Sequence, residues 1–165
     1  MISAGLLDRL RSLYALLVKI ASCLRCPLLF ALRLYCGWQF MQTGFGKLTN
    51  LSNTAEFFAS LHIPFPTVNA AMAGTTECVG GFLLLIGLIS RLAAVPLIVT
   101  MIVAYLTAEI DTVKSIFSDP DKFIAATPFL FLLTCLLVFA FGPGAISVDR
   151  WIGLDDPTGR PPSTN

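Results

Sequence analysis

The stretch TTECVGGFLLLIGLIS, residues 75–90, holds one charged side chain, Glu77, at the head of a long apolar run. The next formal charge along the chain is Arg91. Such a run is typical of a helix that crosses a bilayer, whose hydrocarbon core is about 30 Å thick and requires about 20 residues. A carboxyl group facing lipid at that depth costs about 2.5–3.5 kcal/mol. Glu77 therefore predicts a membrane helix that packs against other helices.

The composition of the whole chain also indicates a membrane protein. Of its 165 residues, 56% are hydrophobic and 13% are charged, and the mean hydropathy is +0.80. Soluble domains carry about 25% charged residues, so this chain lacks the polar surface that a water-exposed globule needs. The net charge is +1, and the basic stretches lack interleaved aromatic residues, so we expect no nucleic-acid partner.

Four apolar runs reach or approach the length of a membrane span. They cover residues 27–46, 67–89, 92–108 and 123–141. Pro27 suits the first turn of the first span. We therefore predict an all-α integral membrane protein, a four-transmembrane-helix bundle over residues 27–150. Residues 151–165 predict a disordered cytoplasmic tail.

Residues 1–26 predict an amphipathic helix that lies in the membrane interface. One face would carry six aliphatic side chains, those of Leu6, Leu10, Leu13, Leu17, Ile20 and Leu24. Charged side chains, mostly basic, fall on the other side, which favours contact with the cytoplasmic leaflet. A cleaved export signal is the alternative, but Lys19 interrupts its apolar stretch and leaves it too short.

The basic residues are unevenly divided between the two predicted sides of the membrane. One side would hold seven, namely Arg9, Arg11, Lys19, Arg25, Arg91, Arg150 and Arg160. The other side would hold Lys47, Lys114 and Lys122. Cytoplasmic loops carry the excess of Lys and Arg, so we predict that both termini are cytoplasmic.

The five cysteines do not indicate a disulfide framework. Cys23 and Cys26 have the C-x-x-C spacing of redox and zinc sites. The sequence offers no second cysteine pair or histidine cluster to complete a metal site, and its single histidine, His62, is expected at the opposite interface. We interpret the pair as two interfacial cysteines on a helix and predict no metal site.

Polar residues in the first two spans predict where the helices meet. Glu77 lies near the middle of its span, so it needs a partner inside the bundle. Arg33 is the expected partner, and Gln39 and Gln42 are the alternatives. Five glycines are expected to allow close helix packing, namely Gly37, Gly44, Gly74, Gly80 and Gly81.

A second polar group is expected at the outer surface. Glu109 and Asp111 follow the third span at the predicted level of Lys47, and together they would form an outer rim cluster worth under about 1 kcal/mol. Tyr105 lies near the outer end of the same span. The segment 48–66 predicts a short helix that lies on the outer surface or dips into the membrane as a lid.

Three stretches of the sequence resemble the DoxX family. They are RLYCGWQFMQTGFGKL (33–48), ECVGGFLLLIGLISRLAA (77–94) and FGPGAISVD (141–149), and the resemblance covers about residues 28–150. It implies a bacterial inner-membrane protein of four helices. The family takes its name from a membrane subunit of a thiosulfate:quinone oxidoreductase, which raises the expectation of quinone contact. The segment KFIAATPFLFL (122–132) resembles DoxX-type proteins that accompany small secreted metal-responsive peptides.

One hypothesis is a redox-associated membrane protein that binds a quinone, at most as a subunit of a quinone-linked oxidoreductase. Glu77 would exchange a proton, and Arg33 or Lys47 would polarise a quinone carbonyl. Further hydrogen bonds would come from Gln39, Gln42 and Tyr105. The chain carries no flavin, haem or iron–sulfur motif, so electrons would come from a partner subunit or the Cys23/Cys26 pair.

Two alternatives remain open from the sequence. In the first, the protein is a non-enzymatic scaffold or accessory subunit for a protein partner, or a homo-oligomer, and the Glu77–Arg33 pair holds the helices together. In the second, it transports a small solute or metal ion, because carboxylates inside membranes often mark ion paths.

Overall fold

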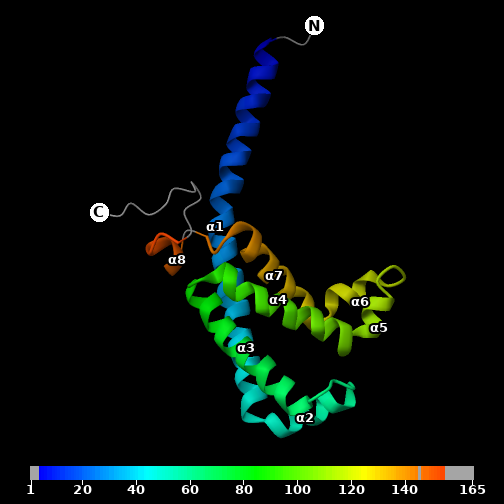
Figure 1. Cartoon of the computed structure of the whole chain (residues 1–165). Coiled ribbons are helices and arrows are strands. Elements are labelled where there is room, and N and C mark those ends of the chain that lie inside the picture. The colour runs from blue at the N-terminus through cyan, green and yellow to red at the C-terminus, as the bar shows by residue number, and fades with distance from the viewer. Residues whose placement is uncertain (1–3, 145, 155–165) are drawn as a thin grey trace.

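A computed structural model describes residues 4–144 and 146–154, which form helices joined by short turns, with no strand among them (Figure 1). The long helices are α1 (Ala4–Thr49), α3 (Pro66–Ile86), α4 (Ser90–Thr107) and α7 (Thr127–Phe141). The short helices are α2 (Leu51–Ser60), α5 (Ile110–Lys114), α6 (Pro120–Ala125) and α8 (Val148–Trp151). The prediction of an all-helical fold is confirmed.

Within the described part of the chain, three helices are long and apolar enough to cross a membrane, namely α1 from Arg9 onwards, α3 and α4. Helix α7 is apolar but has only 15 residues, or about 22 Å at 1.5 Å per residue. The expected fourth span, residues 123–141, begins in α6 and is interrupted at Ala126, where the backbone is extended. Pro128 explains the interruption, because a proline inside a helix removes one hydrogen bond and clashes with the preceding turn.

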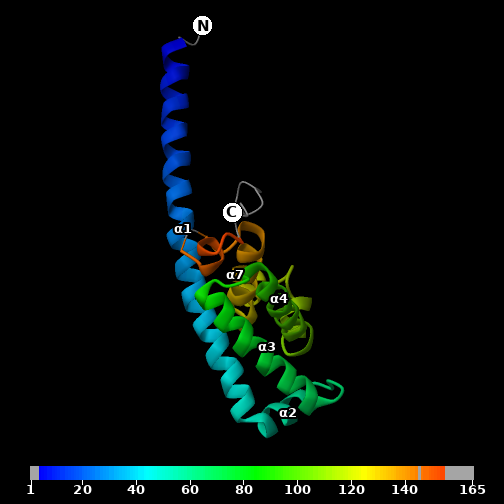
Figure 2. The same cartoon turned by 60° about the vertical axis from the view of Figure 1, so that its left-hand side comes forward.

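Helix α1 is a single helix of 46 residues that runs through Pro27. The expected helix start at Pro27 is therefore wrong. Arg25 joins α1 to the end of α7, since its Nη2 donates to the carbonyl of Phe141 at 2.6 Å. On the N-terminal side, residues 9–25 are all exposed and extend beyond the bundle as a lone helix (Figures 1 and 2). The placement of this segment on a membrane leaflet stays a prediction.

The long helices form two pairs, α1 with α3 and α4 with α7. The tight turn between α3 and α4 joins the pairs, and the two helices diverge from it (Figures 1 and 2). The core lies where the pairs meet, and its largest buried side chains are Phe40, Leu84, Leu97, Met101 and Val138. This arrangement leaves open space between α3 and α4 on the side that faces α2.

Glycines bring the backbones of α1 and α3 into close contact. Gly37 and Gly44 on α1 lie opposite Gly81 and Gly74 on α3, so that both pairs repeat every seven residues. A Cβ atom on Gly44 would lie 2.4 Å from the backbone nitrogen of Cys78, and one on Gly81 would lie 2.8 Å from the carbonyl oxygen of Gly37. Only glycine permits this separation.

Helix α3 also contacts α4 through a glycine. A Cβ atom on Gly80 would lie 3.0 Å from Cγ of Leu97. This contact is with a side chain rather than a backbone, so it is less demanding than the contacts between α1 and α3.

We expect Gly44→Ala to lower the free energy of unfolding by about 1–3 kcal/mol, because the added methyl group meets the α3 backbone. Gly46→Ala is the matched control, since no atom lies within 4 Å of a Cβ at that position. Thermal unfolding in detergent would measure both. Equal stability of the two variants would contradict the close contact.

Candidate functional site

An ion pair between α1 and α3 holds the carboxylate of Glu77. Lys47 Nζ donates to both carboxylate oxygens of Glu77, and Thr43 Oγ1 donates to Oε2 at 3.2 Å. The Glu77 side chain is 2% exposed and that of Lys47 is 30% exposed. The carboxylate is therefore shielded from solvent, whereas part of the Lys47 side chain remains accessible.

The expected pairing of Glu77 with Arg33 is wrong. Because α1 and α3 are antiparallel and Gly44 lies against Gly74, Glu77 is level with the last turns of α1. Lys47 is one turn beyond Gly44, and its long side chain reaches back to the carboxylate. Arg33 lies instead beside the C-terminal end of α3.

The expected rim cluster of Lys47 with Glu109 and Asp111 is not what the structure shows. Glu109 accepts a hydrogen bond from Thr112 Oγ1 at 2.9 Å, and Asp111 lies 3.7 Å from Lys114 Nζ. Both acids are thus engaged within their own segment, where such exposed pairs contribute little stability.

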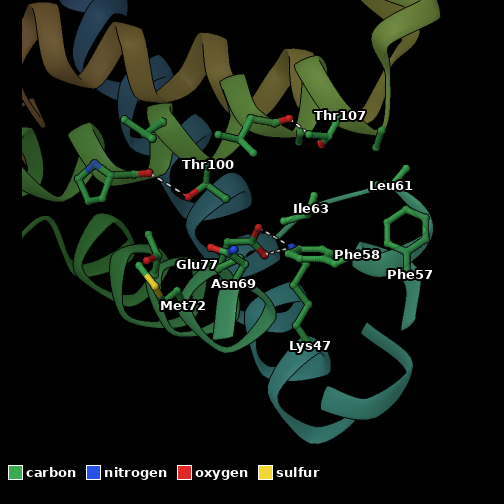
Figure 3. A pocket seen from close by; sticks show the side chains of 17 residues that line it. Lys47, Phe57, Phe58, Leu61, Ile63, Asn69, Met72, Glu77, Thr100 and Thr107 are labelled. Atoms are coloured by element: carbon green, nitrogen blue, oxygen red, sulfur yellow. Dashed lines mark hydrogen bonds and ion pairs between the residues drawn. The ribbon is translucent and has the colours of Figure 1, made fainter. Parts of the chain in front are cut away.

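Beside the ion pair lies a groove of about 510 Å³, bounded by α2 with its following turn, α3 and α4 (Figure 3). Its walls are mainly apolar and include Phe57, Phe58, Leu61, Met72, Val99 and Val103. Lys47 and Glu77 both line the groove, with Met72 on one side of them and Phe57 and Phe58 on the other (Figure 3). The combination of an apolar cavity and one localised charged pair suits a ligand with a polar head and an apolar body.

Three other polar side chains of the groove, those of Asn69, Thr100 and Thr107, are bonded to the backbone, and Thr76 also lines the groove. Asn69 Nδ2 donates to the carbonyl of Pro64 at 2.5 Å, and Thr100 Oγ1 donates to that of Pro96 at 3.0 Å. The lysine ammonium has three donors, and Glu77 occupies two of them. Lys47 is therefore the group best placed to donate a hydrogen bond to a ligand.

The remaining predicted ligand residues lie outside the groove. Tyr105 is buried between α4 and α6, where its hydroxyl donates to the carbonyl of Phe123 at 3.0 Å and the two rings stack at 4.7 Å. Gln39 is half-buried and Gln42 is exposed on α1, and neither belongs to the groove lining. Of the predicted polar residues, only Lys47 and Glu77 are brought together there.

Arg33 is 1% exposed and binds four backbone carbonyls. Its Nε donates to Leu84 at 2.9 Å and its Nη2 to Leu85 at 3.3 Å, both at the C-terminal end of α3. Its Nη1 donates to Pro143 at 2.5 Å and to Ile146 at 3.0 Å. The guanidinium group thus satisfies carbonyls that have no partner within a helix and joins α3 to the segment after α7.

Asp149 completes this junction from the other direction. Its carboxylate accepts hydrogen bonds from the backbone nitrogens of Ile89 at 2.5 Å and Ser90 at 2.8 Å, at the positive end of α4. Its own backbone nitrogen donates to Gly87 at 2.9 Å, and its charge attracts Arg33. The FGPGAISVD segment therefore ties α1, α3 and α4 together. Sequence reasoning missed this role and used the segment only for the resemblance to the DoxX family.

The cysteines and His62 show no further site. Cys23 is exposed, Cys26 is half-buried, and all five cysteines are free thiols. Within residues 4–144 and 146–154, no group of three or more His, Cys, Asp or Glu side chains is placed to hold a metal ion. His62 is exposed, in the turn after α2.

These features define an α-helical integral membrane protein with an apolar groove and the Lys47–Glu77 ion pair beside it. The DoxX family model matches residues 28–110, just over half of the chain, and the protein belongs to that family. The resemblance expected from the sequence is thus confirmed at the level of the family, and the link to metal-responsive peptides stays a prediction.

Two relatives are similar over most of the chain. An uncharacterized protein of Haemophilus influenzae is 27% identical over 138 residues, 79% of this chain and 86% of its own. An uncharacterized membrane protein of Mycobacterium tuberculosis is 29% identical over 136 residues, 75% of this chain and 80% of its own. No solved structure matches.

For the ion pair, we expect Lys47→Met to lower the free energy of unfolding by about 3 kcal/mol, because it leaves a buried carboxylate unpaired. Glu77→Gln should lower the free energy of unfolding by less, since the Lys47 side chain can reach solvent. The double variant Lys47→Met/Glu77→Gln should regain most of the stability that Lys47→Met alone loses. A double-mutant cycle on unfolding in detergent tests this, and additive effects would contradict the pairing.

For the junction, we expect Arg33→Lys to destabilise the fold by about 2–4 kcal/mol, because an ammonium group cannot serve four carbonyls in this geometry. Arg150→Lys is the control, as Arg150 is exposed on α8. The measurement is the midpoint of thermal unfolding. A midpoint for Arg33→Lys that matches the control would show that charge alone suffices.

Proposed function

We propose that this DoxX-family protein binds a lipid-soluble molecule of the quinone class in the groove between α2, α3 and α4. The observation that supports the proposal is the apolar groove of about 510 Å³ with the Lys47–Glu77 pair in its lining. Its volume lies within the range of small-molecule sites, about 300–1,000 Å³. A quinone combines an apolar ring and tail with two carbonyl oxygens, which matches this distribution of polarity.

The chemistry of the Lys47–Glu77 pair supports a quinone over a purely apolar lipid. Lys47 would donate a hydrogen bond to one carbonyl oxygen of the quinone. On reduction that oxygen takes up a proton, which the Lys47 ammonium would deliver; the Glu77 carboxylate, in contact with Lys47 Nζ, stabilises the charged form of the lysine, and the neutral amine would regain its proton from water. The electrons would come from a partner subunit, so the chain itself supplies binding and proton transfer.

The walls of the groove support lateral access from the bilayer. Met72 on α3 and Val99 and Val103 on α4 line the groove and are exposed at the surface of the molecule. In a membrane these helix faces contact lipid, so a molecule with an apolar tail would reach Lys47 without crossing water.

We further propose the bacterial inner membrane as the location, with α6 and α7 together as the fourth crossing. Arg91 at the start of α4 and Arg150 on α8 lie at the end of the bundle from which the N-terminal half of α1 extends (Figure 1). Lys114 and Lys122 lie on α5 and α6, at the far end of α4. The positive-inside rule then supports cytoplasmic termini and an outward-facing α2.

A second candidate is an accessory subunit without a ligand. The hydrogen bonds of Arg33 and Lys47 favour it, because both side chains are already bound within the chain. Arg33 is bound to four carbonyls and Lys47 to both oxygens of Glu77. Each arrangement holds helices together without needing a substrate. The groove then would be a packing defect or a docking place for a partner.

Extraction and chromatography of quinones that co-purify with the protein would separate the two candidates. We expect one quinone per chain in the wild type and much less in the double variant Lys47→Met/Glu77→Gln, which lacks the Lys47 donor but keeps most of the stability of the fold. Ala104→Phe should remove the quinone without changing any charge, because Ala104 lines the groove. Ala140→Phe, at an exposed position on α7, should bind as the wild type does. No quinone in any variant, or equal amounts in all, would favour the accessory role.

A further inference from the structure

The face of α1 that points away from the bundle carries an uncharged stripe. Starting at Leu10 and advancing alternately by four and three residues, the stripe passes Tyr35, Trp38 and Gln42 and reaches Phe45. Each of its residues is exposed. We call this set of residues the outer stripe of α1. Its spacing is the 3.5-residue repeat of helices that supercoil around a partner helix.

The outer stripe lies opposite the face of α1 that builds the bundle. Arg33, Gly37, Phe40 and Gly44 are buried against the rest of the chain and follow their own helical line. Packing within one chain therefore leaves the outer stripe uncovered. Over residues 9–25 the helix also extends beyond the bundle (Figure 2).

Gln42 shows what kind of partner would cover the stripe. It lies seven residues before the end of α1 at Thr49, about 10 Å along the helix, with aromatic Trp38 and Phe45 as its neighbours in the stripe. A side-chain amide is unfavourable in contact with lipid. The amide is both donor and acceptor, so two copies of Gln42 brought face to face satisfy each other.

We propose that two copies of this chain pair through the outer stripe, with their α1 helices parallel and each Gln42 hydrogen-bonded to Gln42 of the other copy. A single polar residue among apolar core positions fixes the register of such a pair. The absence of charge along the stripe permits this self-association. The N-terminal halves of the two helices continue the contact beyond the bundle.

The area available is that of a stable interface. Four aromatic residues of the stripe are 50–71% exposed, namely Tyr14, Tyr35, Trp38 and Phe45. At about 200 Å² for each aromatic side chain, they offer roughly 500 Å². Four leucines add to this with 54–64% exposure, namely Leu10, Leu17, Leu24 and Leu28. The total approaches the roughly 800 Å² per partner of a standard interface.

Photo-crosslinking in cell membranes tests the pairing. Two copies with different epitope tags are co-expressed, each with benzoylphenylalanine in place of Trp38. The control carries the same group in place of Phe82, which is 49% exposed on α3 and lies near the level of Trp38, since Gly81 faces Gly37. We expect a product carrying both tags from Trp38 and not from Phe82.

Substitution of Gln42 then tests the hydrogen bond. Because Gln42 is exposed, Gln42→Leu should leave the monomer folded while lowering the yield of the Trp38 product roughly tenfold. Gln42→Asn should retain part of the yield. The proposal fails if Trp38 and Phe82 give equal yields, if the Trp38 product contains lipid or another protein instead of the second tag, or if Gln42→Leu changes nothing.

Discussion

The close contact between the backbones of α1 and α3 is the constraint on which the rest of the structure depends. Glycines at matching seven-residue intervals allow it, and they also set the register of the two antiparallel helices. That register places Lys47 beside Glu77 and places Arg33 beside the last carbonyls of α3. A shift of one turn would separate both cations from their partners. The glycines therefore determine the electrostatics of the bundle as well as its packing.

Arg33 and Lys47 of α1 form contacts at two levels of α3, its C-terminal end and its middle. At the C-terminal end, Arg33 and Asp149 satisfy the exposed backbone groups of helix ends, which would otherwise be unpaired in an apolar environment. In the middle, Lys47 and Glu77 leave donor capacity beside a groove. The first arrangement is closed and rigid, and the second is open on one side. This difference is why the proposed function is assigned to the groove and not to Arg33.

Much of the fold could be predicted from the sequence, because apolar length and glycine spacing are local signals. The partner of Glu77 could not. Their positions along the first span made Arg33, Gln39 and Gln42 the expected partners of Glu77. Which side chain meets Glu77 depends on the register of α1 against α3, and only the packed structure shows that register. The groove was invisible for a similar reason: Phe57 and Val103 are far apart in sequence, and each looks like an ordinary lipid-facing residue. Likewise, Pro27 looked like a helix start, yet α1 continues through it.

The break at Ala126 bears on the membrane itself. Helix α7 is some 8 Å shorter than the hydrocarbon core, and α6 does not extend it in a straight line. In the proposed topology, the bilayer next to α7 must thin to match this short apolar surface. Because α7 lines no part of the groove, the thinnest part of the bilayer would lie beside α7 and not beside the groove.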